Sequence, residues 1–234
     1  MENPRRDISG PRILLADDHG IFTESLRALL QESYTVIGSV ADGHALIADA
    51  AKLKPDLVIV DIGMPLLNGL DAARRLTALL PKVKIVFLTM QDDPNLAAAA
   101  LELGNVGFVL KHSAASELLT AIEHVIGGKS YVTPKLRSED WAMRANRVQQ
   151  FSKELSPRQR DIVQLFAEGR SPKEICGLLN LTYKTVMFHK YHIMELFHLK
   201  SNADLVIFAL QHGLIQLKPG ALECEPLKAG VRGR

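Results

Sequence analysis

Hydrophobic residues over positions 1–127 follow two alternating patterns. Nearly continuous apolar runs rich in Val, Ile and Leu predict buried strands at residues 12–16, 34–40, 57–60, 85–88 and 106–110. Between them, apolar residues at helical spacing predict helices at residues 21–30, 44–53, 70–80, 94–103 and 114–126. Strands that alternate with helices and are apolar on both faces are typical of parallel βαβ units. We therefore expect an α/β domain with a doubly wound, five-stranded parallel sheet of the flavodoxin-like kind.

Positions 155–215 carry only the helical pattern, and each predicted helix has a start signal. Ser156 and Ser171 each precede a proline, Thr182 precedes the third helix and Ser201 the fourth. The third helix, at residues 183–197, is longer than the two before it. Four helices with a short turn between the second and third predict an all-α helix–turn–helix domain.

The remaining segments complete the predicted organisation. Residues 128–154 form an interdomain linker, with a polar helix at 138–151 that Ser138 would cap. Residues 216–234 contain glycine and proline without periodicity, and we expect a flexible C-terminal tail there. The α/β domain then spans residues 1–127 and the helical domain residues 155–215.

Composition excludes several classes of protein. Apolar residues make up 47% and charged residues 23% of the 234 positions, as in globular rather than disordered chains. The longest apolar runs have six residues, against the roughly 20 that cross a bilayer, and the polar N-terminus lacks the apolar core of a secretory signal. Cys176 and Cys224 have neither disulfide nor metal-site spacing. We therefore expect reduced thiols in a cytoplasmic protein without a membrane partner.

The net charge of +2 combines two opposite halves. Residues 1–127 hold 11 basic and 16 acidic side chains, residues 128–154 hold 6 and 3, and residues 155–234 hold 11 and 7. An acidic N-terminal part and a basic C-terminal part indicate two domains with different partners.

Polar residues follow four of the five predicted strands. Asp17 and Asp18 come after the first strand, Asp61 after the third, Thr89 after the fourth and Lys111 after the fifth. Ligands of open parallel sheets bind beyond the carboxyl ends of the strands, so we expect these side chains to share one cleft. Three crowded carboxylates repel one another unless a cation lies among them, and oxygen ligands suit Mg²⁺. The lysine and the threonine would hold a phosphoryl group, and one aspartate would be the nucleophile that forms an aspartyl phosphate.

These residues resemble the receiver domain of bacterial two-component response regulators. The matching stretches are Leu15-Ala16-Asp17-Asp18-His19, Val60-Asp61-Ile62-Gly63-Met64-Pro65 with Asn68-Gly69, Leu88-Thr89-Met90, and Gly107-Phe108-Val109-Leu110-Lys111. The resemblance implies that Asp61 accepts phosphate from a partner histidine kinase. It assigns Mg²⁺ to Asp17, Asp18, Asp61 and the backbone carbonyl of Gly63. It implies that Thr89 and Lys111 bind the phosphoryl oxygens. It also implies that Phe108 is a switch residue whose side-chain rotamer changes when Thr89 moves. His19 is expected at a helix start facing solvent.

The third helix of the back half would read DNA. Its N-terminal part would enter a major groove, and Lys173, Lys184, His189 and Lys190 would contact phosphates. Val186, Ile193 and Phe197 form a buried stripe, while the opposite side carries Met187, Phe188 and Tyr191. This apolar side would contact thymine methyl groups, serve a protein interface, or weaken DNA binding by replacing phosphate contacts.

Residues 155–215 resemble the LuxR-type effector domain of the NarL/FixJ subfamily. The carriers include Leu155-Ser156-Pro157-Arg158, Ala167-Glu168-Gly169, Thr185-Val186 with His189, and His212-Gly213-Leu214. The resemblance implies that the third helix reads double-stranded DNA and that the fourth, at residues 201–212, pairs two protomers. The candidate DNA contacts are then Lys173, Lys184, Thr185, Met187, Phe188, His189, Lys190 and Tyr191.

Together these features predict a transcription factor controlled by phosphorylation that works as a homodimer. Its only enzymatic chemistry would be hydrolysis of its own aspartyl phosphate. Two alternatives come from other classes: a true phosphatase or phosphotransferase with an aspartyl intermediate, and a signalling adaptor whose apolar helix face, Met187, Phe188 and Tyr191, binds protein instead of DNA.

Overall fold

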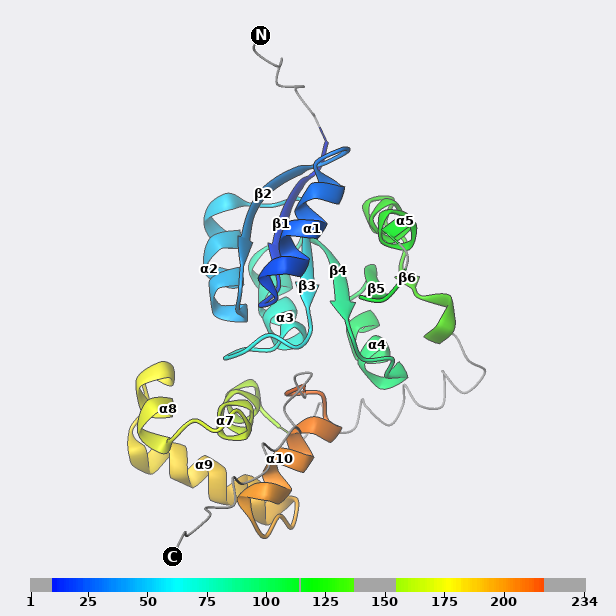
Figure 1. Cartoon of the computed structure of the whole chain (residues 1–234). Coiled ribbons are helices and arrows are strands. Elements are labelled where there is room, and N and C mark those ends of the chain that lie inside the picture. The colour runs from blue at the N-terminus through cyan, green and yellow to red at the C-terminus, as the bar shows by residue number, and fades with distance from the viewer. Residues whose placement is uncertain (1–9, 114, 137–154, 217–234) are drawn as a thin grey trace, which may run out of the picture.

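The protein folds into two domains (Figure 1), seen here in a computed structural model that describes residues 10–113, 115–136 and 155–216. The first domain holds a parallel sheet with the strand order β2-β1-β3-β4-β5-β6. Its strands are β1 (Arg12–Ala16), β2 (Thr35–Val40), β3 (Leu57–Asp61), β4 (Lys84–Thr89), β5 (Val106–Leu110) and β6 (Tyr131–Val132). The expected doubly wound order of the first five strands is confirmed.

Strand β6 is the one element of the sheet that the sequence pattern does not predict. It has two residues, which pair with Gly107 and Phe108 of β5 and are followed by the 3₁₀ turn η1 (Pro134–Leu136). Two residues are too few for a hydrophobic period to be detected. The sheet therefore extends into the segment predicted as linker.

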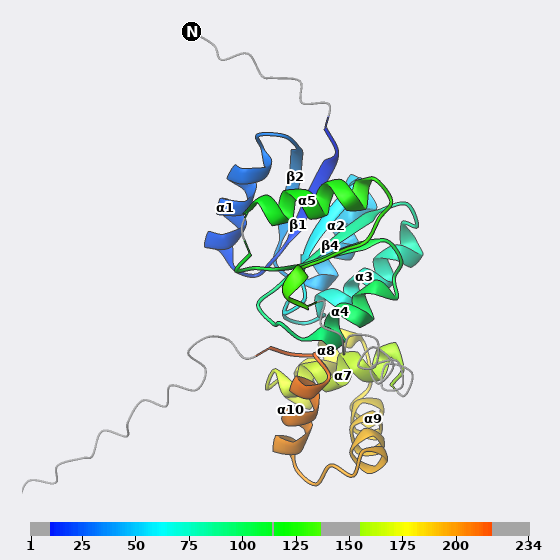
Figure 2. The ribbon, with the colours of Figure 1, turned by 90° about the vertical axis from the view of Figure 1, so that its right-hand side faces the viewer.

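Helices cover both faces of the sheet, as Figure 2 shows. They are α1 (Gly20–Leu30), α2 (Gly43–Leu53), α3 (Gly69–Leu79), α4 (Pro94–Leu101) and α5 (Ala115–Ile126). One core lies between the sheet and α2, α3 and α4, and the other between the sheet and α1 and α5. Burial of the strands on both faces explains why their sequences are continuously apolar.

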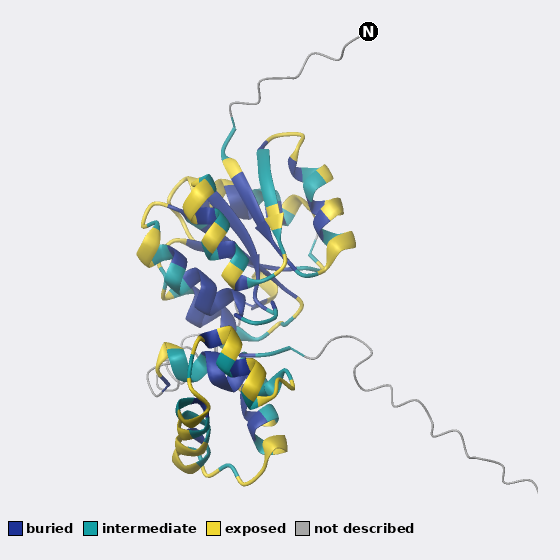
Figure 3. Cartoon of the chain, turned by 90° about the vertical axis from the view of Figure 1, so that its left-hand side faces the viewer, coloured by how far each residue is buried: buried dark blue, intermediate teal, exposed yellow. Residues whose placement is uncertain are grey.

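The second domain consists of four helices, as predicted. They are α7 (Pro157–Ala167), α8 (Pro172–Leu179), α9 (Tyr183–Leu196) and α10 (Asn202–Gln211). Ser156, Ser171 and Ser201 each form a capping box at a helix start, and Thr182 caps α9. Figure 3 shows the buried sides of these helices turned toward one another. The predicted helix at 138–151 and residues 217–234 of the predicted tail lie outside the described residues.

The two domains meet between α7 and the loop that joins β3 to α3. Gln164 of α7 is 1% exposed, and its Oε1 accepts from the backbone N–H of Asn68 at 2.9 Å. Its Nε2 donates to the carbonyl of Met64 at 3.2 Å. Leu66 packs against the core of the helical domain, and its N–H donates to the Glu168 carboxylate at 3.0 Å. The loop that follows Asp61 is thus the docking surface of the second domain.

Ion pairs flank this contact. Arg160 Nε donates to Asp71 Oδ1 at 2.8 Å, and Arg75 Nη2 donates to Asp161 Oδ1 at 2.5 Å. Both carboxylates are buried, at 3% and 2% exposure. Burial raises the pKa of Asp161 above its ordinary value, and the charge of Arg75 opposes that rise. Buried pairs of this kind depend on their partner, because removing one member leaves an uncompensated charge.

Candidate functional site

The predicted site residues gather at the carboxyl ends of the strands. Asp17 follows β1, Asp61 is the last residue of β3, Thr89 is the last of β4 and Lys111 follows β5. Neighbouring strands are parallel and in register, with Asp61 opposite Leu88 and Thr89 opposite Leu110. The sheet therefore brings these side chains to one edge, as the sequence predicts.

Lys111 connects two of the carboxylates. Its Nζ lies 2.7 Å from Asp61 Oδ2 and 2.8 Å from Asp17 Oδ2. Its side chain is 5% exposed and lies over the ring of Phe22, 4.9 Å from the centroid. The ammonium group is thus held beside the Asp61 carboxylate, where it can also form a charge-assisted hydrogen bond with an anionic ligand.

The acidic cluster has the composition of a cation site. Asp17, Asp18, Asp61 and His19 each offer one ligand atom, and these atoms lie within 4.8 Å of one another. His19 is the N-cap of α1, as expected, but its ring turns back toward the carboxylates, with Nδ1 3.0 Å from Asp17 Oδ1 and from Asp18 Oδ1. Carboxylate oxygens in this arrangement fit a hard cation such as Mg²⁺.

Asp61 is buried, with 3% of its surface exposed. Burial raises the pKa of its carboxyl group, Lys111 opposes the rise, and the charge of Asp17 adds to it. The Gly63 N–H donates to Asp61 Oδ1 at 3.1 Å. An ionisable group whose pKa is perturbed by burial and by named charges in a cleft is a candidate functional residue.

The predicted switch residues, Thr89 and Phe108, lie on the neighbouring strands β4 and β5. Thr89 is fully buried, and its Oγ1 accepts from the N–H of Gln91 at 3.1 Å. Phe108 is also fully buried, in the core beneath α4, and pairs across the sheet with Phe87. The predicted switch residues therefore occupy adjacent strands, with the ring of Phe108 in an inward position.

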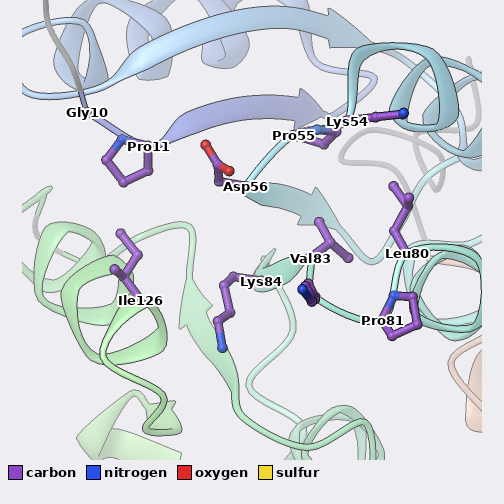
Figure 4. A pocket seen from close by; sticks show the side chains of 11 residues that line it. Gly10, Pro11, Lys54, Pro55, Asp56, Leu80, Pro81, Val83, Lys84 and Ile126 are labelled. Carbon is purple, nitrogen blue, oxygen red and sulfur yellow. The ribbon is translucent and has the colours of Figure 1, made fainter.

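A wider groove lies at the other edge of the sheet (Figure 4). It has a volume of about 730 Å³, and most of its lining residues precede β1, β3 and β4, including Pro11, Asp56 and Val83. None of the predicted site residues lines it. Its size therefore does not make it the site of the predicted chemistry, because the chemically matched groups gather at the opposite edge.

Helix α9 lies on the side of its domain away from the α/β domain (Figures 1 and 2). Val186 and Ile193 are fully buried, whereas Tyr183, Phe188 and Tyr191 are 61%, 65% and 62% exposed. Phe188 stacks on His192 with a centroid distance of 6.0 Å. The predicted buried stripe is confirmed for Val186 and Ile193 and the apolar outer side for Phe188 and Tyr191, whereas Phe197 of the stripe and Met187 of the outer side are each half-buried.

The predicted DNA contacts have different surroundings. Lys173 and Lys184 are exposed, whereas Met187 and His189 are half-buried. Thr185 donates its N–H to the capping Thr182 at 3.2 Å. The remaining candidate is Lys190. Its Nζ donates to Asn202 Oδ1 at 2.7 Å and lies 4.7 Å from the ring centroid of Phe166, so this lysine contacts its own domain.

Comparison with known families agrees with this architecture. The model of the response regulator receiver domain matches residues 13–123, and that of bacterial regulatory proteins of the luxR family matches residues 153–209. The chain belongs to the two-component response regulators with a LuxR-type DNA-binding domain. This family consists of regulators, not of a known class of enzymes, and it does not favour the adaptor alternative.

Individual relatives span nearly the whole chain. The transcriptional regulatory protein MctR of Rhizobium johnstonii is 32% identical over 87% of this chain and 95% of its own length. The oxygen regulatory protein NreC of Staphylococcus carnosus is 32% identical over 87% and 99%. Among solved structures, RcsB of Salmonella enterica serovar Typhimurium, bound to a promoter in the presence of a phosphomimetic, is 26% identical with a TM-score of 0.59, over 87% of this chain and all of that one. The described part of this chain contains no helix with the length and apolar character of a membrane span.

Sequence patterns missed the residues that join the domains. Gln164 and Glu168 bond to a loop about 100 positions away, and Gln216, placed in the predicted tail, reaches Thr89 127 positions away. These contacts join separate domains, so no period or motif in either domain marks them. Gln164 is 1% exposed, and a buried polar side chain of this kind indicates a hydrogen-bonded contact. Its burial can be recognised only once the two domains are seen together.

Proposed function

We propose that a partner histidine kinase phosphorylates this chain on Asp61 and that the phosphorylated form binds double-stranded DNA through α9. The supporting observation is the ammonium group of Lys111, 2.7 Å from Asp61 and 2.8 Å from Asp17 at the carboxyl ends of the strands. In the transfer, a carboxylate oxygen of Asp61 forms the new P–O bond, the P–N bond to the kinase histidine breaks, and the imidazole leaves. Lys111 and Thr89 then hold the phosphoryl oxygens.

A labelling experiment tests the acceptor. Wild type, Asp61→Asn and the control Asp49→Asn are incubated with a labelled small phosphodonor and Mg²⁺. Asp49 is matched because it is a partly exposed carboxylate on α2, 3.5 Å from Lys52. We expect labelling of wild type and of the control, and none of Asp61→Asn. Unchanged labelling of Asp61→Asn contradicts the assignment of the nucleophile.

We propose Mg²⁺ as the resident cation, held by Asp17, Asp18, Asp61 and the carbonyl of Gly63. When bound, it supplies positive charge to the phosphoryl oxygens. Calorimetric titration with Mg²⁺ tests the site without any phosphoryl transfer. Asp18→Asn is expected to weaken binding, while Asp49→Asn leaves it unchanged. Equal binding by both variants contradicts the site.

We propose that DNA recognition uses Lys173, Lys184 and Thr185 together with the apolar outer side of α9. Contacts of lysines to phosphates make affinity fall with salt, whereas Phe188 and Tyr191 would contact thymine methyl groups or stack at the backbone. A gel shift on the upstream region of the chain's own gene, at several salt concentrations, tests this. No shift of phosphorylated protein at low salt contradicts it.

The active form is proposed to be a homodimer paired through α10, because helix–turn–helix proteins read paired half-sites. Ile207 on α10 is 52% exposed. Sedimentation of phosphorylated Ile207→Glu is expected to give a monomer, whereas Ile21→Glu, at an exposed position of α1, dimerises like wild type. A dimer in both variants contradicts the pairing surface.

Three further assignments belong to the same proposal. The chain's own catalysis is limited to hydrolysis of its aspartyl phosphate, measured as loss of label over time. The cytoplasm is its location, because bacterial chromosomal DNA lies there. The predicted domain bounds of 1–127 and 155–215 change at one point: β6 and the buried Leu136 belong to the α/β domain, so we place the linker after residue 136, and limited proteolysis is expected to cut between the domains.

A further inference from the structure

Gln216 brings a side chain of the helical domain to the phosphoacceptor site. Its Nε2 lies 3.4 Å from Oγ1 of the buried Thr89. Its carboxamide also lies against Gly63, because a Cβ built on that glycine would be 2.4 Å from Gln216 Oε1. The carboxamide thus contacts both the hydroxyl assigned to the phosphoryl group and the residue whose carbonyl is assigned to the cation.

The position of Gln216 is fixed by the end of the helical domain. Gly213 has a φ of +64° and turns the chain after α10, and the N–H of Leu214 donates to the Ala209 carbonyl at 2.9 Å. Leu214 is buried in the helical core. A Cβ on Gly213 would be 2.3 Å from Leu96 of α4, so the turn packs directly on the α/β domain. Gln216 lies two residues after the buried Leu214, so its backbone is held close to the α/β domain.

The side chain also has space to leave. An open cavity of about 270 Å³ lies between the domains, and its lining includes Gly63, Glu168, Arg170 and Gln216. A carboxamide in contact with Thr89 on one side and with a cavity on the other can move away without unfolding either domain.

We propose that Gln216 occupies the place of the phosphoryl group, so that docking of the helical domain slows phosphorylation of Asp61 and phosphorylation displaces Gln216. The inference rests on the proposed function of Asp61. Coupling between the two events is reciprocal: if the docked side chain disfavours phosphorylation by a given factor, phosphorylation disfavours docking by the same factor. Loss of one neutral hydrogen-bonded contact corresponds to about a 2- to 10-fold change.

Two substitutions of Gln216 are expected to change the rate of labelling in opposite directions. Gln216→Ala removes the carboxamide and is expected to raise the rate of labelling by a small phosphodonor about 2- to 10-fold. Gln216→Glu keeps the length but places a negative charge beside the incoming anion, and it is expected to lower the rate below wild type. A merely structural role would not produce a faster and a slower variant. Gln211→Ala and Gln211→Glu, at an exposed position of α10, serve as controls and should match wild type.

The full-length chain is used throughout, and Asp61→Asn is measured in parallel. Labelling that depends on Asp61, with Gln216→Ala faster and Gln216→Glu slower, supports the inference. If Gln216→Ala is equal to or slower than wild type while labelling still requires Asp61, the inference fails and the proposed function stands. If Asp61→Asn is labelled like wild type, the proposed function itself fails. Circular dichroism checks that all variants are folded.

Discussion

The substitution Gln164→Ala should loosen the contact between the domains without touching the phosphoacceptor site. The side chain bridges two backbone groups of the loop 62–68, accepting from the Asn68 N–H at 2.9 Å and donating to the Met64 carbonyl at 3.2 Å. Alanine leaves both groups unsatisfied in the docked arrangement, whereas water satisfies them when the domains separate. An unsatisfied buried polar group costs about 1–3 kcal/mol. One such group alone corresponds to about a 5- to 150-fold shift of the docking equilibrium toward the open form, and this is the least shift expected from losing both contacts.

Hydrogen exchange at the amide of Leu66 measures this shift directly. This N–H donates to Glu168 Oε1 at 3.0 Å, and Gln164 Nε2 donates to the same oxygen at 2.8 Å, so the substitution spares the bond of the reporter amide but removes one contact of its acceptor. Its exchange rate follows the population of the open form. We expect exchange to accelerate by the same factor, and Gln211→Ala to leave it unchanged. Exchange within twofold of wild type would show that the bridging side chain contributes almost nothing to docking, contrary to this expectation.

Three further predictions concern stability and DNA binding. Ser171→Ala removes a capping box, which should lower the free energy of unfolding by about 1 kcal/mol and, for a domain of this size, the melting temperature by about 4–8 °C in calorimetry. Lys184→Ala should reduce the salt slope of DNA affinity by about 1, while Lys129→Ala leaves it unchanged. The pKa of Asp161 is raised by burial against the opposing charge of Arg75, so the folded state binds a proton more tightly than the unfolded state. Relative to Asp161→Asn, wild type should therefore lose stability in denaturant titrations as the pH rises above about 4.

The fold and the acceptor site could largely be predicted from local patterns. Residues 12–16 and 106–110 are strands in the structure with the predicted bounds, because burial on both faces makes them continuously apolar. Once strands are parallel, their carboxyl ends share an edge, so the residues that follow them must meet. Asp61 and Lys111 are 50 positions apart and β4 lies between their strands, yet the shared edge lets the long side chain of Lys111 reach Asp61 at 2.7 Å.

The contacts between the domains have a different origin. Gln164 has no hydrophobic period to indicate that it is buried, and its partners are backbone groups, which every sequence contains. Gln216 follows the last buried residues of the helical domain, where polar composition is typical of a tail. Only the fold of both domains together determines that these side chains face the loop 62–68 and Thr89.

The arrangement also limits how phosphorylation can control DNA binding. Helix α9 already faces away from the α/β domain, with Phe188 and Tyr191 more than 60% exposed, so covering of the reading helix is not the restraint here. The restraint lies at the other end of the helical domain, where Gly213 packs on Leu96 and Gln216 contacts Thr89. Paired half-sites require two reading helices at a fixed spacing, about one turn of DNA or a multiple of it, and a docked domain cannot adjust to that spacing freely. Release of the segment after α10 would therefore act on the pairing of protomers rather than on access to a single recognition helix.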